Sequence, residues 1–180
     1  MDKSLTHWLN AAAGSSAWLD PVMIAITKFG VPLMVLAVAV QWWVQNDRPR
    51  IRFVALSAGL SFLLGLGLNQ IILLFVQRIR PYDAGVTHLI IEKSADWSFP
   101  SDHATAGVAI VTAFAMQGLP RRTLVLSVLT FMICWSRVYV GLHYVSDLFG
   151  GAITGVIGGI AVRYLYQPHS RLNQFATRIL

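Results

Sequence analysis

Residues 53–76, FVALSAGLSFLLGLGLNQIILLFV, form an apolar run without a charged side chain. A helix of this length can cross the roughly 30 Å of hydrocarbon in a bilayer. Polar residues and Pro21 interrupt an earlier segment, 5–28, so we predict it as a sixth crossing that is broken or lies partly in the interface. The other apolar runs are predicted as crossings at roughly 31–45, 104–117, 123–140 and 148–166, with a break at KFGVP, residues 28–32, before the first of them.

The composition agrees with a membrane protein. Hydrophobic residues make up 56% of the 180 residues, charged residues only 12%, and the mean hydropathy is +0.61. A soluble domain carries about 25% charged residues. We therefore predict an all-α integral membrane protein, a six-transmembrane-helix bundle that forms a single domain over residues 1–180.

The basic residues fit a membrane better than a nucleic acid. The net charge is +6, but Lys and Arg are scattered between apolar runs and form no stripe with interleaved aromatic residues. The single cysteine, Cys134, lies inside an apolar run and offers no disulfide framework. Glycines recur in GGAITGVIGG, residues 150–159, and predict close packing against a neighbouring helix.

Charge also predicts an orientation. Six crossings would place 46–52, 118–122 and both termini on one side of the membrane. By the positive-inside rule that side is cytoplasmic, and the segments 78–103 and 137–147 would face outward. The basic residues of the cytoplasmic side would be Lys3, Arg48, Arg50, Arg52, Arg121, Arg122, Arg163, Arg171 and Arg178.

The stretch WSFPSDHATAGVA, residues 97–109, places polar side chains directly before an apolar run. Proline suits the first turn of a helix, and the free N–H groups of such a turn favour an anion. Taken alone, Ser101 and Asp102 also fit a plain helix cap. The other polar segments favour the anion site.

Two further segments bring ionisable groups to the same membrane face. WSRVYVGLHYVSD, residues 135–147, contains Arg137 and sets His143 and Asp147 four residues apart, so that they share a helix face. A carboxylate beside a histidine fixes its tautomer and stabilises its positive charge. VQRIRPYD, residues 76–83, adds Arg78 and Arg80, and an arginine at this depth needs an anion or water.

These three segments together predict an anion site equipped for phosphoryl transfer. The chemistry demands no metal and no other cofactor. A membrane lipid is the expected substrate and the lipid bilayer the expected partner, while nucleic acid is not expected. The oligomeric state is not predicted from the sequence.

The pattern of Arg80-Pro81, then Pro100-Ser101-Asp102-His103, then Ser136-Arg137 with Gly141, His143 and Asp147, resembles the type 2 phosphatidic acid phosphatase (PAP2) superfamily. The resemblance spans roughly residues 53–166. It implies a six-helix membrane phosphatase that works without metal, with its site on the non-cytoplasmic face. It further implies His143 as nucleophile, Asp147 as its orienting acid, His103 as proton donor, and Arg80, Ser101 and Arg137 as phosphate ligands.

One position departs from the family pattern. The fullest first motif has a lysine seven residues before the arginine, and Leu73 stands there in this chain. We hypothesise that Arg78 supplies part of the missing charge to the substrate phosphate, with Asp102 also in the phosphate-binding group.

The shortened first motif and SADWSFPSDH resemble the undecaprenyl-diphosphatase branch associated with bacitracin resistance. That branch also has a histidine at the position of His88, a possible accessory site residue. This resemblance implies hydrolysis of undecaprenyl diphosphate to undecaprenyl phosphate, in a bacterial inner membrane, with the site facing the periplasm or cell exterior.

Two other functions fit the same residues. Within enzymes, the alternative is a phosphatidylglycerol phosphate or phosphatidate phosphatase, because the motifs do not define headgroup or tail selection. From another class, a small anion transporter also places arginines and histidines at a membrane mouth.

Overall fold

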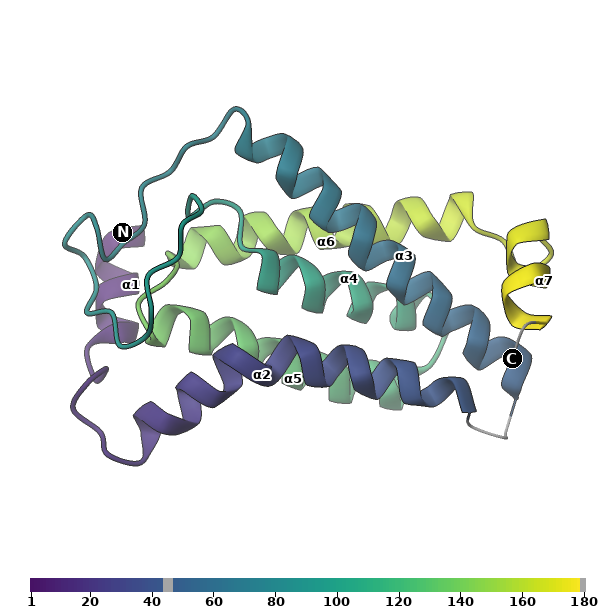
Figure 1. Cartoon of the computed structure of the whole chain (residues 1–180), viewed down its shortest axis with the longest axis horizontal. Coiled ribbons are helices and arrows are strands. Elements are labelled where there is room, and N and C mark those ends of the chain that lie inside the picture. Colours follow the sequence, from purple (N-terminus) through teal and green to yellow (C-terminus); the bar gives the residue numbers. More distant parts are fainter. Residues whose placement is uncertain (44–46, 179–180) are drawn as a thin grey trace.

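The computed structural model describes residues 1–43 and 47–178, and within them every regular element is helical. Two short helices flank a bundle of long ones, and one 3₁₀ turn extends the first long helix (Figure 1). The elements are α1 (Asp2–Asn10), α2 (Leu19–Val40), η1 (Gln41–Trp43), α3 (Arg48–Leu73), α4 (Asp102–Met116), α5 (Pro120–Tyr139), α6 (Val145–Leu165) and α7 (Arg171–Arg178).

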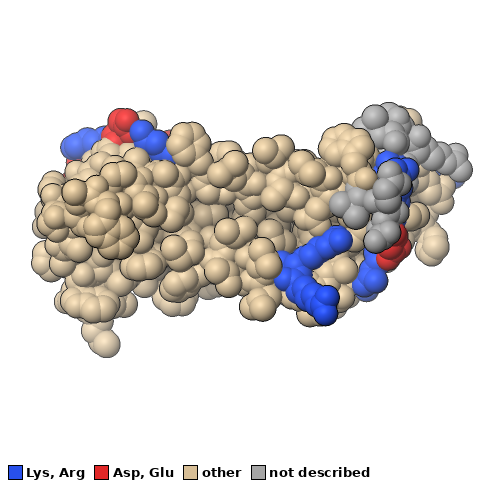
Figure 2. All heavy atoms as spheres, turned by 90° about the horizontal axis from the view of Figure 1, so that it is seen from below, with Lys and Arg blue, Asp and Glu red and all other residues tan. Residues whose placement is uncertain are grey.

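The predicted apolar runs at 53–76, 104–117, 123–140 and 148–166 all form helices, α3 to α6. Three spans among the described residues are long and apolar enough to cross a membrane, namely Leu19–Trp43, Arg48–Leu73 and Val145–Leu165. Figure 2 shows Lys, Arg, Asp and Glu gathered toward the two ends of the elongated molecule, with uncharged surface between them on the visible face. The all-helical fold is confirmed.

The predicted break at 28–32 does not exist, because α2 runs through it with Pro32 inside the helix. Packing against α5 carries the helix through this stretch. Thr27 Oγ1 donates to Ser136 Oγ at 2.8 Å, and a Cβ on Gly30 would come within 2.6 Å of Ile133. Neighbouring helices of this kind let an apolar helix tolerate proline. The predicted run at 31–45 is thus the second half of α2 as far as it is described.

The predicted sixth crossing over 5–28 is wrong. Its first part is the short helix α1, followed by turns up to Trp18. Asp20 organises these turns by accepting hydrogen bonds from the N–H groups of Gly14 (3.2 Å) and Ser16 (3.3 Å) and from the Tyr139 hydroxyl (2.6 Å). The polar residues that interrupt the apolar run therefore build a folded turn at one end of the bundle.

The first and last helices, α1 and α7, lie at opposite ends of the bundle (Figure 1). Helix α1 contacts the end of α5 and the start of α6, whereas α7 lies beside the start of α3. The prediction that both termini share one side is therefore wrong, since it depended on the sixth crossing. Lys3 lies at the end opposite Arg171.

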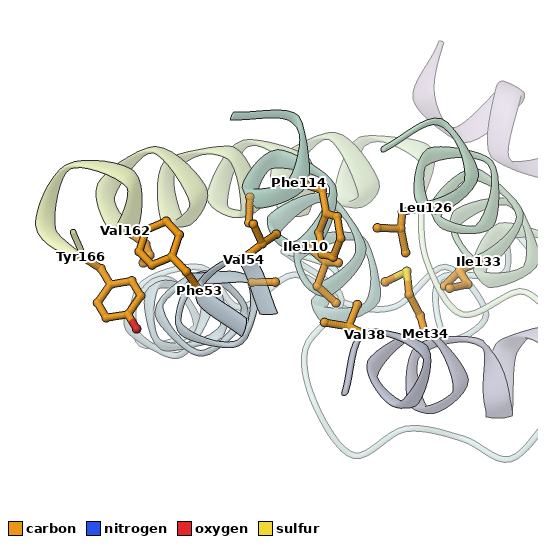
Figure 3. Close-up of a cluster of buried hydrophobic side chains, with 12 residues drawn as sticks. Met34, Val38, Phe53, Val54, Ile110, Phe114, Leu126, Ile133, Val162 and Tyr166 are labelled. Atoms are coloured by element: carbon orange, nitrogen blue, oxygen red, sulfur yellow. The ribbon is translucent and has the colours of Figure 1, made fainter. Parts of the chain in front are cut away.

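A buried apolar cluster packs the five long helices, α2, α3, α4, α5 and α6, against one another (Figure 3). The ring of Phe53 stacks on Tyr166 with centroids 5.1 Å apart, which ties the start of α3 to the end of α6. Aliphatic and aromatic side chains fill the rest: Met34, Val38, Val54, Ala58, Ile110, Ala113, Phe114, Leu126, Ile133 and Val162.

Glycines let α6 approach α3 and α4 closely, as the sequence predicted. A Cβ on Gly151 would lie 2.3 Å from the Ser101 carbonyl oxygen, and one on Gly155 would lie 2.7 Å from the Thr105 carbonyl oxygen. Real Cβ atoms do not come this close, so these positions admit only glycine without backbone movement. The contact fixes the start of α6 beside the start of α4.

Candidate active site

A polar cavity lies where α4 and α6 begin and α5 ends, and residues 74–101 fold over this end of the bundle (Figure 1). Its volume is about 140 Å³, below the roughly 300–1,000 Å³ of pockets that enclose drug-sized ligands. The cavity therefore holds a small group. Its lining residues are Leu73, Arg80, Ser94, Asp96, Trp97, Pro100, Asp102, His103, Arg137 and His143.

A second, larger groove of about 360 Å³ lies between α2 and α3. Trp42 and Phe62 are among the apolar side chains that line it, and it has no ionisable side chain in its wall. This groove therefore offers no group for acid–base or nucleophilic chemistry.

His143 is buried, and its two ring nitrogens have different surroundings. Nδ1 lies 2.9 Å from the carbonyl oxygen of Ser98. A carbonyl only accepts hydrogen bonds, so Nδ1 carries the proton in the neutral ring and Nε2 keeps its lone pair. Nε2 is the atom that faces the arginines of the cavity. This tautomer is the one a nucleophilic histidine requires.

Arg80 and Arg137 bring two guanidinium groups to Nε2 of His143, at 3.4 Å and 3.5 Å. Both arginines are buried, 6% and 8% exposed. Arg80 is held by the carbonyl oxygens of Asp96 (2.7 Å), Trp97 (3.2 Å) and Leu142 (3.0 Å).

Neither of these two arginines has a carboxylate partner within 4.0 Å among the described residues. Nε of Arg137 is buried without any hydrogen-bond acceptor. A buried cation is costly unless an anion pairs with it. The two guanidinium groups therefore form a site for an anion directly in front of His143 Nε2.

Asp147 lies behind His143, with Oδ2 3.5 Å from Nδ1. Its carboxylate is fully buried and accepts hydrogen bonds from Ser98 Oγ at 2.6 Å and from the Tyr144 N–H at 2.8 Å. A carboxylate in this position stabilises an imidazolium more than a neutral imidazole. Ser98 thus contacts both residues: its carbonyl oxygen accepts from His143, and its hydroxyl donates to Asp147.

The start of α4 supplies the remaining polar groups. His103 and Asp102 line the cavity, and Asn69 Nδ2 donates to Asp102 Oδ1 at 2.7 Å. Ser101 occupies the N-cap position without a capping side-chain hydrogen bond. Its buried Oγ has no partner, so the plain helix cap does not explain this serine. Pro100 precedes the cap and does not lie in the first turn.

Four residues predicted for the site do not line the cavity, namely Ser101, Asp147, Arg78 and His88. Ser101 and Asp147 lie behind residues of the wall. The Arg78 guanidinium donates to Asp147 Oδ1 at 2.6 Å and does not line the cavity, whereas Leu73, where the family lysine is missing, does line it. His88 is exposed and its ring lies against Gly14. The structure thus places neither Arg78 nor His88 in the wall of the cavity.

Burial controls the protonation of His143, which lies in the loop between α5 and α6. Burial lowers the pKa of His143 to about 4, and the hydrogen bond to Asp147 opposes this shift while the charges of Arg137 and Arg80 add to it. Burial likewise lowers the pKa of Arg80 from its usual value. His143 is therefore neutral near pH 7, with Nε2 unprotonated.

Comparison with known proteins gives a consistent result. The family model described as the PAP2 superfamily matches residues 54–171. Undecaprenyl-diphosphatase BcrC of Bacillus subtilis is 32% identical over 145 residues, covering 78% of this chain and 72% of that protein. Phosphatidylglycerophosphatase B of the same species is 28% identical over 176 residues, covering 87% and 80%.

A solved structure shares the fold. The crystal structure of a transmembrane PAP2-type phosphatidylglycerolphosphate phosphatase from Bacillus subtilis matches with a TM-score of 0.66 at 24% identity, covering 94% of this chain and 88% of that one. The family match covers the two arginines and the two histidines of the cavity, and Asp147. The chain belongs to the PAP2 superfamily of phosphatases.

Proposed function

We propose that this phosphatase hydrolyses the terminal phosphate of a polyprenyl diphosphate, undecaprenyl diphosphate, through a phosphohistidine on His143. One observation carries the proposal: two buried guanidinium groups without carboxylate partners meet at Nε2 of a neutral histidine whose Nδ1–H is held by a backbone carbonyl. An anionic phosphoryl group between Arg80 and Arg137 would lie directly in front of the nucleophile.

The first step forms a bond between Nε2 and the terminal phosphorus while the bond from phosphorus to the bridging oxygen breaks. His103 would donate a proton to the departing oxygen, and Asp147 would stabilise the imidazolium. In the second step water attacks the phosphohistidine, and His103 takes a proton from that water. Phosphate leaves and His143 recovers its lone pair. Ser101, with its unpartnered hydroxyl, would hold a phosphoryl oxygen.

Two observations support a lipid substrate. The cavity of about 140 Å³ has room for a phosphoryl group but not for a lipid tail, and three spans among the described residues have the length and hydropathy of membrane crossings. The tail would therefore lie outside the cavity, along the apolar helices. The relative BcrC, named for undecaprenyl diphosphate, supports the polyprenyl substrate.

A phosphatidylglycerol phosphate substrate is the second candidate. Phosphatidylglycerophosphatase B is similar over 87% of the chain. This substrate is a monoester whose leaving group is an alkoxide, whereas the polyprenyl diphosphate releases a stabilised phosphate. Arg80 and Arg137 can bind the phosphate of either headgroup. The two substrates are therefore distinguished by measured turnover and not by the geometry of the site.

We also propose that helices α2 to α6 lie in a bacterial inner membrane with the cavity on the periplasmic or exterior side. The opposite end of the molecule consists of the starts of α3 and α5, the end of α6, and α7. This end carries eight of the fourteen Lys and Arg residues. Of the eight acidic residues, only Asp47 belongs to it. The positive-inside rule favours that end as cytoplasmic. In intact spheroplasts, an impermeant thiol reagent should label an Asp83→Cys variant but not Arg121→Cys, and the reverse result would overturn this orientation.

The direct test of the activity is phosphate release by the purified protein in detergent with EDTA. Undecaprenyl diphosphate, phosphatidylglycerol phosphate and phosphatidate are compared at equal surface concentration. Faster turnover of the diphosphate would support the proposal. Faster turnover of a glycerolipid would overturn the polyprenyl substrate and support the second candidate function. Flux of a small anion through proteoliposomes without hydrolysis would instead support a transporter.

The pH dependence of kcat/KM should reflect the low pKa of His143. The free enzyme loses its nucleophile only as the pH falls through about 4, because protonation of Nε2 removes the lone pair. After correction for the ionisation of the substrate phosphate, we expect the acid limb below about pH 5 instead of near 6.5, the ordinary histidine value. An acid limb centred at about 6.5 would contradict the buried, neutral state of His143.

His103→Ala should affect substrates according to their leaving groups. A monoester must release an alkoxide, which needs a proton, so we expect its turnover to fall by about 10²–10⁴. The diphosphate releases a stabilised phosphate and should lose clearly less. Measuring kcat for phosphatidylglycerol phosphate and undecaprenyl diphosphate with the same variant tests this, and equal losses on both would refute the role of His103 as proton donor.

A further inference from the structure

The start of helix α6, which carries Asp147, is capped by side chains from α1. Asp2 Oδ1 accepts a hydrogen bond from the Ser146 N–H, and Thr6 Oγ1 accepts one from the Val145 N–H, both at 3.1 Å. The first N–H groups of a helix have no partner within it and need acceptors from elsewhere. Helix α1 is therefore bound to the segment that positions Asp147.

Arg78 joins Asp2 to Asp147. Its Nη2 donates to Asp2 Oδ2 at 2.6 Å, and its Nη1 donates to Asp147 Oδ1 at 2.6 Å. The guanidinium lies over the Tyr144 ring, 3.8 Å from the centroid. The Ser146 hydroxyl donates to Asp2 Oδ2 and accepts from Arg78 Nη1. Two carboxylates thus share one cation, with Asp147 buried and Asp2 and Arg78 about one-third exposed.

The combined charge of Asp2, Arg78 and Asp147 affects how well a positive charge on the His143 ring is stabilised. Arg78 alone would cancel the charge of Asp147, and an imidazolium formed on His143 would then face a neutral pair. With Asp2 present, the three groups carry one net negative charge behind the imidazole. Burial raises the pKa of Asp2, but the hydrogen bonds from Ser146 and Arg78 together with the charge of Arg78 outweigh it and lower the pKa below its usual value. Asp2 is therefore ionised at neutral pH. Its charge adds to the stabilisation of the phosphorylated, positively charged ring.

We propose that Asp2 and Arg78 are positioning residues: both hold Asp147 in place through the hydrogen bonds of Arg78, and Asp2 supplies the net negative charge that the imidazolium partner of Asp147 requires. This inference rests on the proposed function, since it assigns the two residues to the phosphohistidine step. It replaces the expectation that Arg78 contacts the substrate phosphate. Asp2 then acts on the rate of phosphoryl transfer and not on phosphate binding.

Other contacts hold α1 in place without Asp2, which makes the inference testable. Asn10 Nδ2 donates to the carbonyl oxygens of Tyr139 at 2.7 Å and His88 at 2.9 Å, and Asn10 Oδ1 accepts the His88 N–H at 2.7 Å. Thr6 keeps its bond to α6. Asp2→Asn removes the charge while an amide oxygen still accepts the Ser146 N–H, so the helix should stay docked.

The test compares Asp2→Asn and Asp2→Glu with wild type in the purified full-length protein. Asp83→Asn is the matched control, because it neutralises an exposed carboxylate paired with Lys93 on the same end of the molecule. The readouts are kcat, KM, the rate of phosphoenzyme formation by rapid quench, inhibition by inorganic phosphate, and the melting temperature. The substrate is the lipid that wild type turns over fastest.

We expect Asp2→Asn to lower kcat and phosphoenzyme formation roughly 10- to 100-fold, the range for groups that orient a functional ligand. KM and inhibition by phosphate should change less than about threefold, as for an interaction made only in the transition state. Asp2→Glu should recover much of the rate, and Asp83→Asn should match wild type. Arg78→Met should lower kcat further without weakening inhibition by phosphate.

An unchanged kcat in Asp2→Asn, with wild type active, would overturn this inference and leave the proposed function intact. So would an Arg78→Met variant that stays folded but loses inhibition by phosphate, since that marks Arg78 as a phosphate ligand. A fall in rate matched by a fall in melting temperature, without recovery in Asp2→Glu, would also overturn it in favour of a structural role. Absence of hydrolysis by wild type on every lipid would overturn both the function and the inference.

Discussion

His143→Ala is expected to abolish phosphate release from every lipid substrate, by at least about 10⁴-fold in kcat, as when a covalent nucleophile is removed. Nε2 of His143 is the atom that lies between the two guanidinium groups, 3.4 Å from Arg80 and 3.5 Å from Arg137. The substrate should still bind, since both arginines remain. Binding of labelled inorganic phosphate separates these two effects.

His7→Ala is the matched control for this experiment. His7 lies on the same end of the molecule, is exposed, and makes a single hydrogen bond, to the Val86 carbonyl oxygen at 3.1 Å. Its loss should leave turnover unchanged. Acid-labile phosphate trapped on wild type but not on His143→Ala would identify the intermediate. Trapping of equal label on both proteins would place the nucleophile elsewhere and refute the mechanism.

The sequence predicted the helices of the bundle because their apolar runs are continuous. It failed at the N-terminus, where two local signals pointed the wrong way. Lys28 and Pro32 indicated a break, but packing of Thr27 and Gly30 against α5 keeps α2 intact. The polar residues around Asp20 indicated a broken crossing, but they form a turn with Tyr139, a partner more than one hundred residues away. Such contacts are not visible in local sequence.

The motif residues were predictable because their chemistry is specific in type and spacing. Arg80, His103, Arg137 and His143 line one cavity as expected. Three residues that hold other site residues in place were not predicted from the sequence, namely Ser98, Asn69 and Asp2. Ser98 lies within the quoted motif, but its two contacts depend on the fold of the loop.

Asn69 and Asp2 were also missed. A polar side chain in an apolar run is a signal that identifies Asn69, whose amide holds Asp102. No local signal identifies Asp2. Its partners, Arg78 and Ser146, lie far along the chain and meet it only in the folded protein.

Arg137→Ala is expected to give the second largest loss, about 10³-fold in kcat/KM, within the range for a guanidinium that stabilises a phosphoryl transition state. Arg137 is buried, its Nε has no partner, and no carboxylate within 4.0 Å neutralises it among the described residues. Its charge is therefore available to the substrate. Arg80 is also bound to three backbone carbonyls, so its removal would disturb the loop, and Arg137 is the cleaner test.

Arg137→Lys distinguishes charge from geometry. A lysine keeps the charge but lacks the planar fork that binds two phosphoryl oxygens, so it should recover only part of the loss. Arg121→Ala, an exposed arginine at the opposite end, controls for the loss of one positive charge. Inhibition by inorganic phosphate should weaken in Arg137→Ala and stay normal in Arg121→Ala. If Arg137→Ala stays folded and binds phosphate as wild type does, the two-arginine anion site is refuted, and with it the reason for placing phosphorus in front of His143.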